Sequence, residues 1–286
     1  ESHGSDVGWE EGLGEGPSRL GPLALVTGYL VIDGKVGLGG IGEDYGFVIS
    51  SRECDDRRDA PVTFPWNSTS SHILLRHVNI QDCGHRLDPT NGSEDAIYTY
   101  DNGLQYFVLE NSYVHDAFRC VMFLQNCSDV RIEGTTLARG GLHHEANSIA
   151  LRNCENVAIQ RNVLVDAYGS MISLQGARNV AIHGNVLRRT LEDWELWTAI
   201  HVTGEIAAVF VHGNTFHDLA GLNVGVRGDE AVGSALQVFN NLWAHNHTNQ
   251  VMLSGEHAYN AFYDNLRGDT PLDDAIEEAT KQVLDA

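Results

Sequence analysis

The chain has 286 residues, 42% of them hydrophobic, and its 39 acidic and 18 basic residues give a formal net charge of −21. This excess of acid argues against nucleic acid as a partner, because nucleic-acid binding depends on many contacts of Lys and Arg with phosphate. No run of 18 apolar residues is present that could span a membrane. Acidic side chains also bind divalent cations, so Ca²⁺ is a candidate cofactor.

The N-terminal part differs in composition from the rest of the chain. Residues 1–22 are rich in Gly, Glu and Ser and are expected to form a poorly ordered lead-in. Two apolar runs, Tyr29–Ile32 and Phe47–Ile49, are predicted to be the first strands. Residues 55–69 and 84–94 have no periodic pattern and are expected to be long loops.

A short phrase, apolar-x-apolar-x-x-Asn-x-apolar, recurs between Ile73 and Leu266. Its polar positions are Ser112, Thr135, Asn162, Asn185, Asn214, Asn241 and Asn265, at intervals of 23 to 29 residues. Apolar and polar residues alternate within the phrase, which is the period of a strand. A unit of this length without a helix has room for three short strands. The repeat therefore predicts one all-β domain over residues 23–270, a single-stranded parallel β-helix of about 8–10 coils.

The asparagine of each phrase is expected to be part of the scaffold. A side-chain amide satisfies backbone groups at a bend, and amides stacked in successive coils can pair as a ladder. We predict this ladder for Asn162, Asn185, Asn214, Asn241 and Asn265.

A second strand precedes each phrase and is expected to carry the functional surface. If Ile97, Met122, Ile149, Ile172, Ile200 and Val224 point inward, alternation sends their following neighbours outward, namely Tyr98, Phe123, Ala150, Ser173, His201 and Gly225. The next outward column is Tyr100, Gln125, Arg152, Gln175, Thr203 and Arg227. Aromatic, amide, hydroxyl and guanidinium groups in such a strip suit a sugar chain.

The turns that enter this strand hold the densest cluster of reactive side chains. These turns and the outward strand columns together supply the candidate catalytic residues His144, Glu145, Asp95, Tyr98 and Arg119. They also supply the candidate substrate-binding residues Tyr100, His143, Arg152, Tyr168, Trp194, Trp197, His201 and Arg227. The alternative for any single member is a solvated loop residue. A further column, which includes Asp116, Arg139 and Asp166, is expected to form ion pairs between coils.

The cysteines and glycosylation sequons bear on the compartment. Cys54, Cys83, Cys120, Cys127 and Cys154 match no zinc signature. Cys127 and Cys154 share one repeat position, so they form either a disulfide or two buried thiols. Four N-x-S/T sequons, at Asn67, Asn91, Asn126 and Asn246, favour a secreted or cell-surface protein.

The C-terminal part begins a helical pattern. Thr270 is a candidate N-cap, Pro271 stands at the first helical position, and Leu272, Ile276, Ala279 and Val283 share one face. Because a solenoid needs its open end covered, residues 271–286 are predicted to be a capping helix.

The phrases from Val157 to Leu164 and from Val180 to Leu187 read V-x-I-x-x-N-x-hydrophobic. In them, the chain resembles the pectate-lyase-like superfamily of right-handed parallel β-helices over residues 24–270. The resemblance implies a right-handed coil and covers lyases, hydrolases, epimerases and noncatalytic surface proteins. His144 and Glu145 also resemble the last two positions of the Asp-Pro-His-Asp/Glu motif of mannuronan epimerases.

Three functions follow as hypotheses, all with a polysaccharide or oligosaccharide as partner. A lyase or epimerase of uronic-acid glycans needs a base for the C5 proton, here His144, Tyr98 or Arg119, and Arg152 or Ca²⁺ on the carboxylate. No lysine lies between Lys35 and Lys281, which excludes a lysine base in the coils. A glycoside hydrolase would use two carboxylates such as Asp95 and Glu145. The third hypothesis is a noncatalytic adhesin, surface protein or glycan-binding rod.

Overall fold

The computed structural model describes residues 17–35, 45–50, 60–66, 68, 70–81, 95–100, 103–140, 147–191, 196–248 and 253–263. Its strands form three parallel sheets, called sheets A, B and C below. Sheet A contains β1 (Ser18–Leu20), β4 (Phe47–Ser50), β7 (Val78–Gln81), β10 (Tyr113–Ala117), β13 (Thr136–Gly140), β16 (Val163–Ala167), β19 (Val186–Arg188), β22 (Thr215–His217), β25 (Leu242–Ala244) and β28 (Ala261–Tyr263).

Sheet B contains β2 (Leu23–Ala24), β5 (Val62–Phe64), β8 (Ile97–Thr99), β11 (Met122–Gln125), β14 (Asn147–Arg152), β17 (Ser170–Gln175), β20 (Leu196–Thr203), β23 (Ala220–Gly228) and β26 (His247–Thr248). Sheet C contains β3 (Leu30–Asp33), β6 (Ser71–Arg76), β9 (Gln105–Glu110), β12 (Ser128–Glu133), β15 (Glu155–Gln160), β18 (Arg178–His183), β21 (Ala207–His212), β24 (Leu236–Phe239) and β27 (Glu256–Ala258). A short 3₁₀ helix, η2 (Glu230–Ala235), connects β23 to β24.

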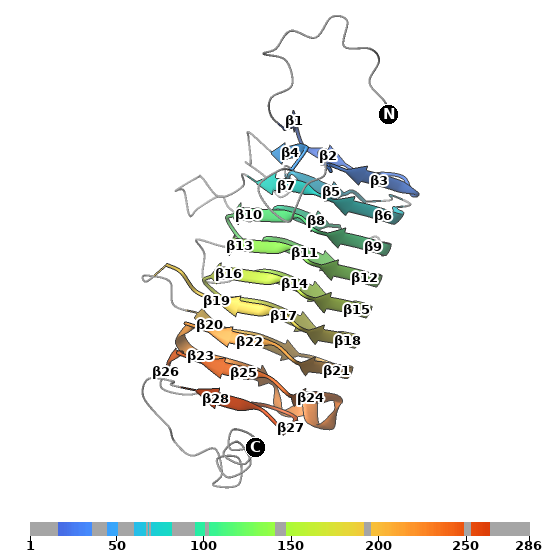
Figure 1. Ribbon diagram of the computed structural model, residues 1–286. Coiled ribbons are helices and arrows are strands. Elements are labelled where there is room, and N and C mark those ends of the chain that lie inside the picture. Colours follow the sequence, from blue (N-terminus) through green and yellow to red (C-terminus); the bar gives the residue numbers. More distant parts are fainter. Residues whose placement is uncertain are drawn as a thin grey trace, which may run out of the picture.

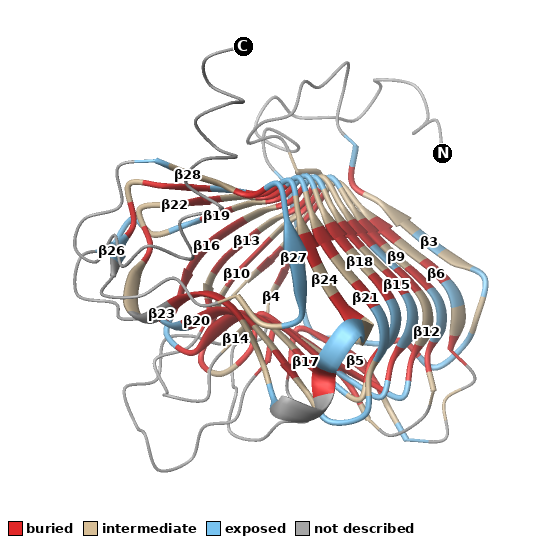
Figure 2. Cartoon of the chain, turned by 90° about the horizontal axis from the view of Figure 1, so that it is seen from below, coloured by how far each residue is buried: buried red, intermediate tan, exposed pale blue. Residues whose placement is uncertain are grey.

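Each coil contributes one strand to each sheet, so strands that are neighbours in a sheet are three apart in sequence order. Figure 1 shows the coils stacked along one axis, and Figure 2 shows the three sheets surrounding a buried interior, with sheet B opposite the corner where sheets A and C meet. The predicted all-β parallel β-helix is confirmed. Among the residues that the structure describes, no helix is long and apolar enough to cross a membrane. The predicted capping helix 271–286 lies outside them.

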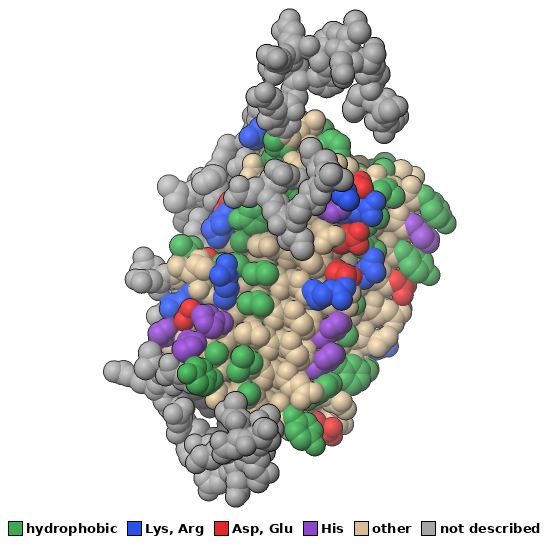
Figure 3. Space-filling model, in the orientation of Figure 1, with side chains coloured by type: hydrophobic (Ala, Val, Ile, Leu, Met, Phe, Trp, Pro, Cys, Tyr) green, Lys and Arg blue, Asp and Glu red, His purple; other side chains and the backbone are tan. Residues whose placement is uncertain are grey.

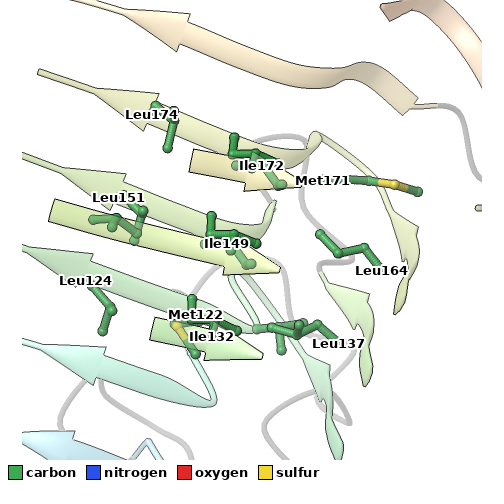
Figure 4. Packing of buried hydrophobic residues seen from close by; sticks show 14 of the residues in the cluster. Met122, Leu124, Ile132, Leu137, Ile149, Leu151, Leu164, Met171, Ile172 and Leu174 are labelled. Carbon is green, nitrogen blue, oxygen red and sulfur yellow. The ribbon is translucent and has the colours of Figure 1, made fainter. Parts of the chain in front are cut away.

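The core consists of inward side chains that stack on their counterparts in the next coil. In sheet B, Met122 pairs with Ile149 and Ile149 with Ile172, all 0% exposed. Leu124, Leu151 and Leu174 form a second row beside them (Figure 4). At the strand spacing of about 4.8 Å, each side chain fills the space above the one below. Burial of one such side chain contributes roughly 1.5–3 kcal/mol.

The asparagine ladder runs along one corner of the coil. Its side-chain amides bond the backbone groups that have no backbone partner at the bend. Asn162 Nδ2 donates to Asn185 Oδ1 at 3.0 Å, and the same contact joins Asn185 to Asn214 and Asn214 to Asn241. Each amide also donates to a backbone carbonyl, as Asn185 does to Ile159. The last member is Asn260, which pairs with Asn241 at 3.1 Å, whereas the predicted Asn265 lies outside the described residues. The final coil is shorter than the preceding ones, and this shortening displaced the predicted position.

The ladder makes a direct prediction for stability. Asn185→Ala removes a side chain that donates to Ile159 O and Asn214 Oδ1 and accepts from the Asn162 backbone N–H. Because these partners are buried, the loss should lower the free energy of unfolding by about 3 kcal/mol. Denaturant titration measures it, with Gln105→Ala, which truncates an exposed amide, as the control within about 0.5 kcal/mol of wild type. Equal stabilities of the two variants would contradict a structural ladder.

Charged and aromatic side chains form rows on the outside of the coil. On sheet C one row in register is Arg76, Glu110, Glu133, Gln160, His183, His212 and Phe239. Arg76 pairs with Glu110 at 3.5 Å, and the rings of His183 and His212 stack at 5.0 Å. Figure 3 shows basic, acidic and histidine side chains following one another down one side of the face in view. Exposed pairs of this kind contribute little each.

The predicted ion pairs between coils also occur beside sheet A. Arg139 Nη2 donates to Asp116 Oδ2 at 2.8 Å, and His115 Nδ1 lies 2.5 Å from the same oxygen. Although burial opposes it, these hydrogen bonds hold the pKa of Asp116 well below its ordinary value. Asp116 and Arg139 both have left-handed backbone, with φ of 61° and 54°. The Asp116–Arg139 pair is therefore part of the scaffold near the ends of β10 and β13.

Three local expectations are corrected by the structure. Strand β1 lies inside residues 1–22, which were expected to be a poorly ordered lead-in, and it pairs with β4. Strand β5 lies within the predicted loop 55–69. In sheet B a register shift pairs Ile200 with Val226 and not with Val224. Gly225 is therefore buried, and Arg227 takes the outward position beside His201.

Cys127 and Cys154 are buried as free thiols. The hydrogen bond with Cys154, together with burial, raises the pKa of Cys127, which keeps this group protonated. Of the sequon asparagines, Asn126 is exposed and Asn246 is 0% exposed. The side-chain oxygen of Asn246 accepts a hydrogen bond from Leu219 N, and its nitrogen donates one to Phe216 O. Asn246 is therefore inaccessible to a glycan in the folded protein.

Candidate functional site

A groove of about 590 Å³ lies on the outer face of sheet B. It crosses four neighbouring coils, because its floor comes from β11, β14, β17 and β20. Its described lining is Arg119, Cys120, Phe123, Asn147, Ala150, Leu151, Arg152, Gly169, Ser170, Ser173, Gln175, Trp197, His201 and Thr203. None of these side chains is a carboxylate, although the whole chain carries a net charge of −21. The described part of the groove is therefore locally cationic.

At one end of the groove, two guanidinium groups lie near one aromatic ring. Arg119 Cζ is 4.7 Å from the centre of the Phe123 ring, and Arg152 Cζ is 5.8 Å from it. Arg152 Nε also donates to Gln175 Oε1 in the next coil at 2.9 Å. Arg152 is exposed, so its remaining N–H groups are available to a ligand. This end provides an apolar surface with positive charge around it.

Asp95 forms an ion pair with Arg119 and so fixes the position of its guanidinium group. Its carboxylate is 0% exposed, accepts two hydrogen bonds from the Arg119 guanidinium, and accepts the backbone N–H of Cys120 at 2.9 Å. Burial alone would lower the pKa of Arg119, but the attraction of Asp95 outweighs it and raises the pKa. The structure thus places the Asp95 carboxylate away from solvent, where it orients Arg119, and its predicted catalytic role stays a prediction.

Trp197 and His201 line the other end of the groove, and Arg227, which is not itself a lining residue, lies beside them. The Trp197 ring meets His201 edge to face at 4.5 Å, and Arg227 Cζ lies 5.1 Å from the centre of the Trp197 ring. The register shift of β23 produces this arrangement, because it places Arg227 beside His201. Burial lowers the pKa of His201 below its ordinary 6.5, and Arg227 adds to the effect while Asp229 opposes it. The neutral form of the His201 imidazole is therefore more favoured than that of a free imidazole.

The remaining candidates fall into three groups. Tyr98 is only 6% exposed and packs under the groove, with its ring stacked on Phe123 at 5.5 Å and edge to face with Tyr100 at 4.7 Å. Tyr100 and the 39% exposed Tyr168 are not among the lining residues. His143, His144, Glu145 and Trp194 lie outside the described residues, and their roles stay predictions.

Several lining residues were not among the predicted site residues. Phe123, Ser173, Gln175 and Thr203 stand in the two outward columns of sheet B that strand alternation predicted as the functional surface. Asn147 belongs to the predicted turn cluster around His143, His144 and Glu145, whereas Ser170 had no such signal. Asn147 Oδ1 accepts the backbone N–H of Ser170 at 3.1 Å, which joins two coils at the edge of the groove.

Asp166 supports the segment that leads to Trp197. It is 2% exposed and accepts hydrogen bonds from Thr190 N and Thr190 Oγ1, both at 2.6 Å, and from Leu191 N at 3.2 Å. The polypeptide is thereby anchored before it returns to β20. Over the described part of the chain, no three His, Cys, Asp or Glu side chains are grouped so that they could hold a metal ion. Ca²⁺ stays a prediction.

The ion pair between Asp95 and Arg119 yields a stability prediction. Asp95→Ala leaves a largely buried guanidinium unpaired, which should lower the free energy of unfolding by about 3 kcal/mol. Glu155→Ala, which removes an exposed carboxylate at the start of β15, is the matched control and should change it by less than about 0.5 kcal/mol. Thermal or denaturant unfolding of both variants measures the difference, and a wild-type value for Asp95→Ala would rule out this role.

Comparison with known proteins agrees with this fold. Residues 65–187 match the family model described as a right handed beta helix region. The predicted resemblance to right-handed parallel β-helices is confirmed, and no specific family follows from it. No curated protein sequence matches the chain.

Solved structures similar to the chain include enzymes that act on polysaccharides and a surface adhesin. A family 28 exopolygalacturonase of Yersinia enterocolitica is 11% identical, with 90% of this chain and 68% of that chain covered and a TM-score of 0.46. The surface adhesin PfbA of Streptococcus pneumoniae is 12% identical, with 87% and 71% covered and a TM-score of 0.38. The A-module of the mannuronan C-5 epimerase AlgE6 of Azotobacter vinelandii is 11% identical, with 89% and 82% covered and a TM-score of 0.30.

Proposed function

We propose that the groove on sheet B binds an acidic polysaccharide and acts on its uronate residues as a lyase or epimerase. The observation that carries this proposal is the pairing of arginines with aromatic rings in a groove whose described lining contains no carboxylate. A uronate residue presents an apolar ring face and a carboxylate. Phe123 and Trp197 fit the first, and the guanidinium groups fit the second.

The dimensions of the groove suit a chain and not a single sugar. Phe123, Ala150, Ser173 and His201 are in register on four neighbouring strands. Phe123 and His201 are therefore three strand spacings apart, roughly 14 Å. A linear glycan that lies along the helix axis would contact both cationic ends. Because the rest of the molecule is acidic, a polyanion would bind preferentially in the groove.

The burial of Asp95 distinguishes between the two proposed reaction classes. A glycoside hydrolase needs two carboxyl groups that both reach the scissile bond. Asp95 does not, since its side chain is 0% exposed and is paired with Arg119. Proton abstraction beside a carboxylate instead needs a base and a cation, and both types of group line the groove. We therefore favour the lyase or epimerase, in an extracellular location where such glycans occur.

A noncatalytic glycan-binding protein is the second candidate. The same arginines and rings would hold a polyanion without any reaction, and the dominance of the repeat over local motifs favours such a scaffold. Turnover separates this candidate from the first.

Binding tests the proposal first. Isothermal titration with oligogalacturonate should give heat that decreases with added salt, while a neutral glucan of equal length should give none. Arg152→Gln should weaken binding about tenfold or more, because it removes a charge-assisted contact. Arg178→Gln, which removes an exposed arginine on sheet C, is the control and should bind as wild type does. Equal binding of the acidic and neutral glycans would contradict the proposal.

Activity is tested separately with a panel of acidic polysaccharides. Absorbance of the unsaturated uronate product would identify a lyase, and NMR of the recovered polymer would identify an epimerase. New reducing ends without that absorbance would indicate a hydrolase and overturn the proposed reaction class. Binding without any of these changes would establish the noncatalytic candidate.

A further inference from the structure

We propose that the imidazole of His201 is the general base that removes the C5 proton of a uronate residue held in the groove, with Arg227 on the carboxylate of that residue. This inference rests on the proposed function and names residues that carry it out. It differs from the expectation that the base lies at His144, Tyr98 or Arg119.

The position of His201 supports this role. It lies on the outer face of β20, lines the groove, and is only partly exposed. Its in-register neighbours are Ser173 on β17 and Arg227 on β23, each about one strand spacing of 4.8 Å away along the backbone. The edge-to-face contact with Trp197 at 4.5 Å restricts the imidazole ring from the side. A sugar ring in the groove would therefore meet one ring nitrogen of a positioned imidazole.

The other described lining groups are poor bases near neutral pH. Burial raises the pKa of Cys120 to about 12. The guanidinium groups of Arg119 and Arg152 carry hydrogen-bond donors and no acceptor. Ser170, Ser173 and Thr203 carry hydroxyls, and Asn147 and Gln175 carry amides, none of which accepts a proton readily. Among the lining residues that the structure describes, His201 is the one group that exchanges a proton in the range where an enzyme works.

Burial, and not the balance of the charges around His201, favours the unprotonated form. Arg227 in the neighbouring strand opposes protonation, Asp229 just beyond β23 favours it, and Ser173 and Trp197 are neutral. The net effect of burial and these charges keeps the pKa of His201 below its ordinary 6.5. Among the residues that the structure describes, no carboxylate forms a hydrogen bond or ion pair with His201, and its lowered pKa makes the base available without one.

Arg227 supplies the positive charge that the reaction needs. Its guanidinium lies over the Trp197 ring at 5.1 Å, which fixes it on the same side of the groove as His201. A carboxylate bound there would be neutralised, and this makes the adjacent C5–H bond more acidic. Base and cation are brought together by the register shift between β20 and β23.

The elimination balances as follows. His201 takes the C5 proton, and the electron pair of that bond forms the C4–C5 double bond while the C4–O4 bond breaks. The leaving oxygen takes up a proton from water, and His201 returns its own proton to solvent. In epimerisation the C4–O4 bond stays intact, and a proton is added at C5 from the opposite face of the sugar.

The test uses the full chain with polygalacturonate and polymannuronate as substrates. His201→Gln should lower kcat at least 100-fold, in the range attributed to one general base, while the Kd from isothermal titration stays within about threefold of wild type. His212→Gln is the matched control, because His212 is also a partly buried histidine, but one on sheet C away from the groove. It should retain wild-type turnover.

A pH profile provides a readout that a structural role would not give. For the wild type, kcat/KM should fall at low pH with unit slope through a pKa below 6.5, because protonated His201 cannot accept the proton. Turnover of His201→Gln above one third of wild type, or a wild type that binds uronate without changing it, would overturn the role of His201 and leave the binding groove intact. Absence of uronate binding would instead overturn the proposed function.

Discussion

The whole structure depends on the in-register stacking of one coil on the next. Every described coil hydrogen-bonds to its neighbours through three parallel sheets, so a residue at one position lies about 4.8 Å from its counterpart in the next coil. Inward positions must then be filled by side chains of matched volume, as in the rows of Met122, Ile149 and Ile172. Bends must satisfy their backbone groups by the same device in each coil, and this is the role of the asparagine ladder.

The same constraint converts residues far apart in sequence into a continuous outer surface. Phe123 and His201 are 78 positions apart in the chain, yet they stand in one row on sheet B. Buried carboxylates then orient what lies on this surface. Asp95 fixes Arg119 and Asp166 fixes the segment before Trp197, and neither faces the groove. The functional groups exposed in the described groove are consequently cationic, aromatic and polar.

The sequence predicted the coil and most of its register because alternation and the recurrent asparagine are local signals with a fixed period. It did not predict where that period breaks. The bulge in β23 moves Arg227 into the row of His201. The one local signal for it is Gly225, because a glycine inside a strand often marks a bulge, but this signal does not give the new register. The sequence also did not indicate that Asp95 is buried, because in the sequence it is similar to any other loop carboxylate. Its burial is explained by the ion pair with Arg119, 24 residues later. The strand β5 was missed because Val62–Phe64 is too short to show a period.

The central claim is that the outer face of sheet B, between Phe123 and His201, is where an acidic glycan binds. Crystals soaked with a uronate trisaccharide test it most directly by diffraction. The account predicts electron density for sugar rings against Phe123 and Trp197, with carboxylates at Arg152 and Arg227 and one C5 atom facing His201. Well-ordered sugar on sheet A or sheet C, with the sheet B groove empty, would contradict it.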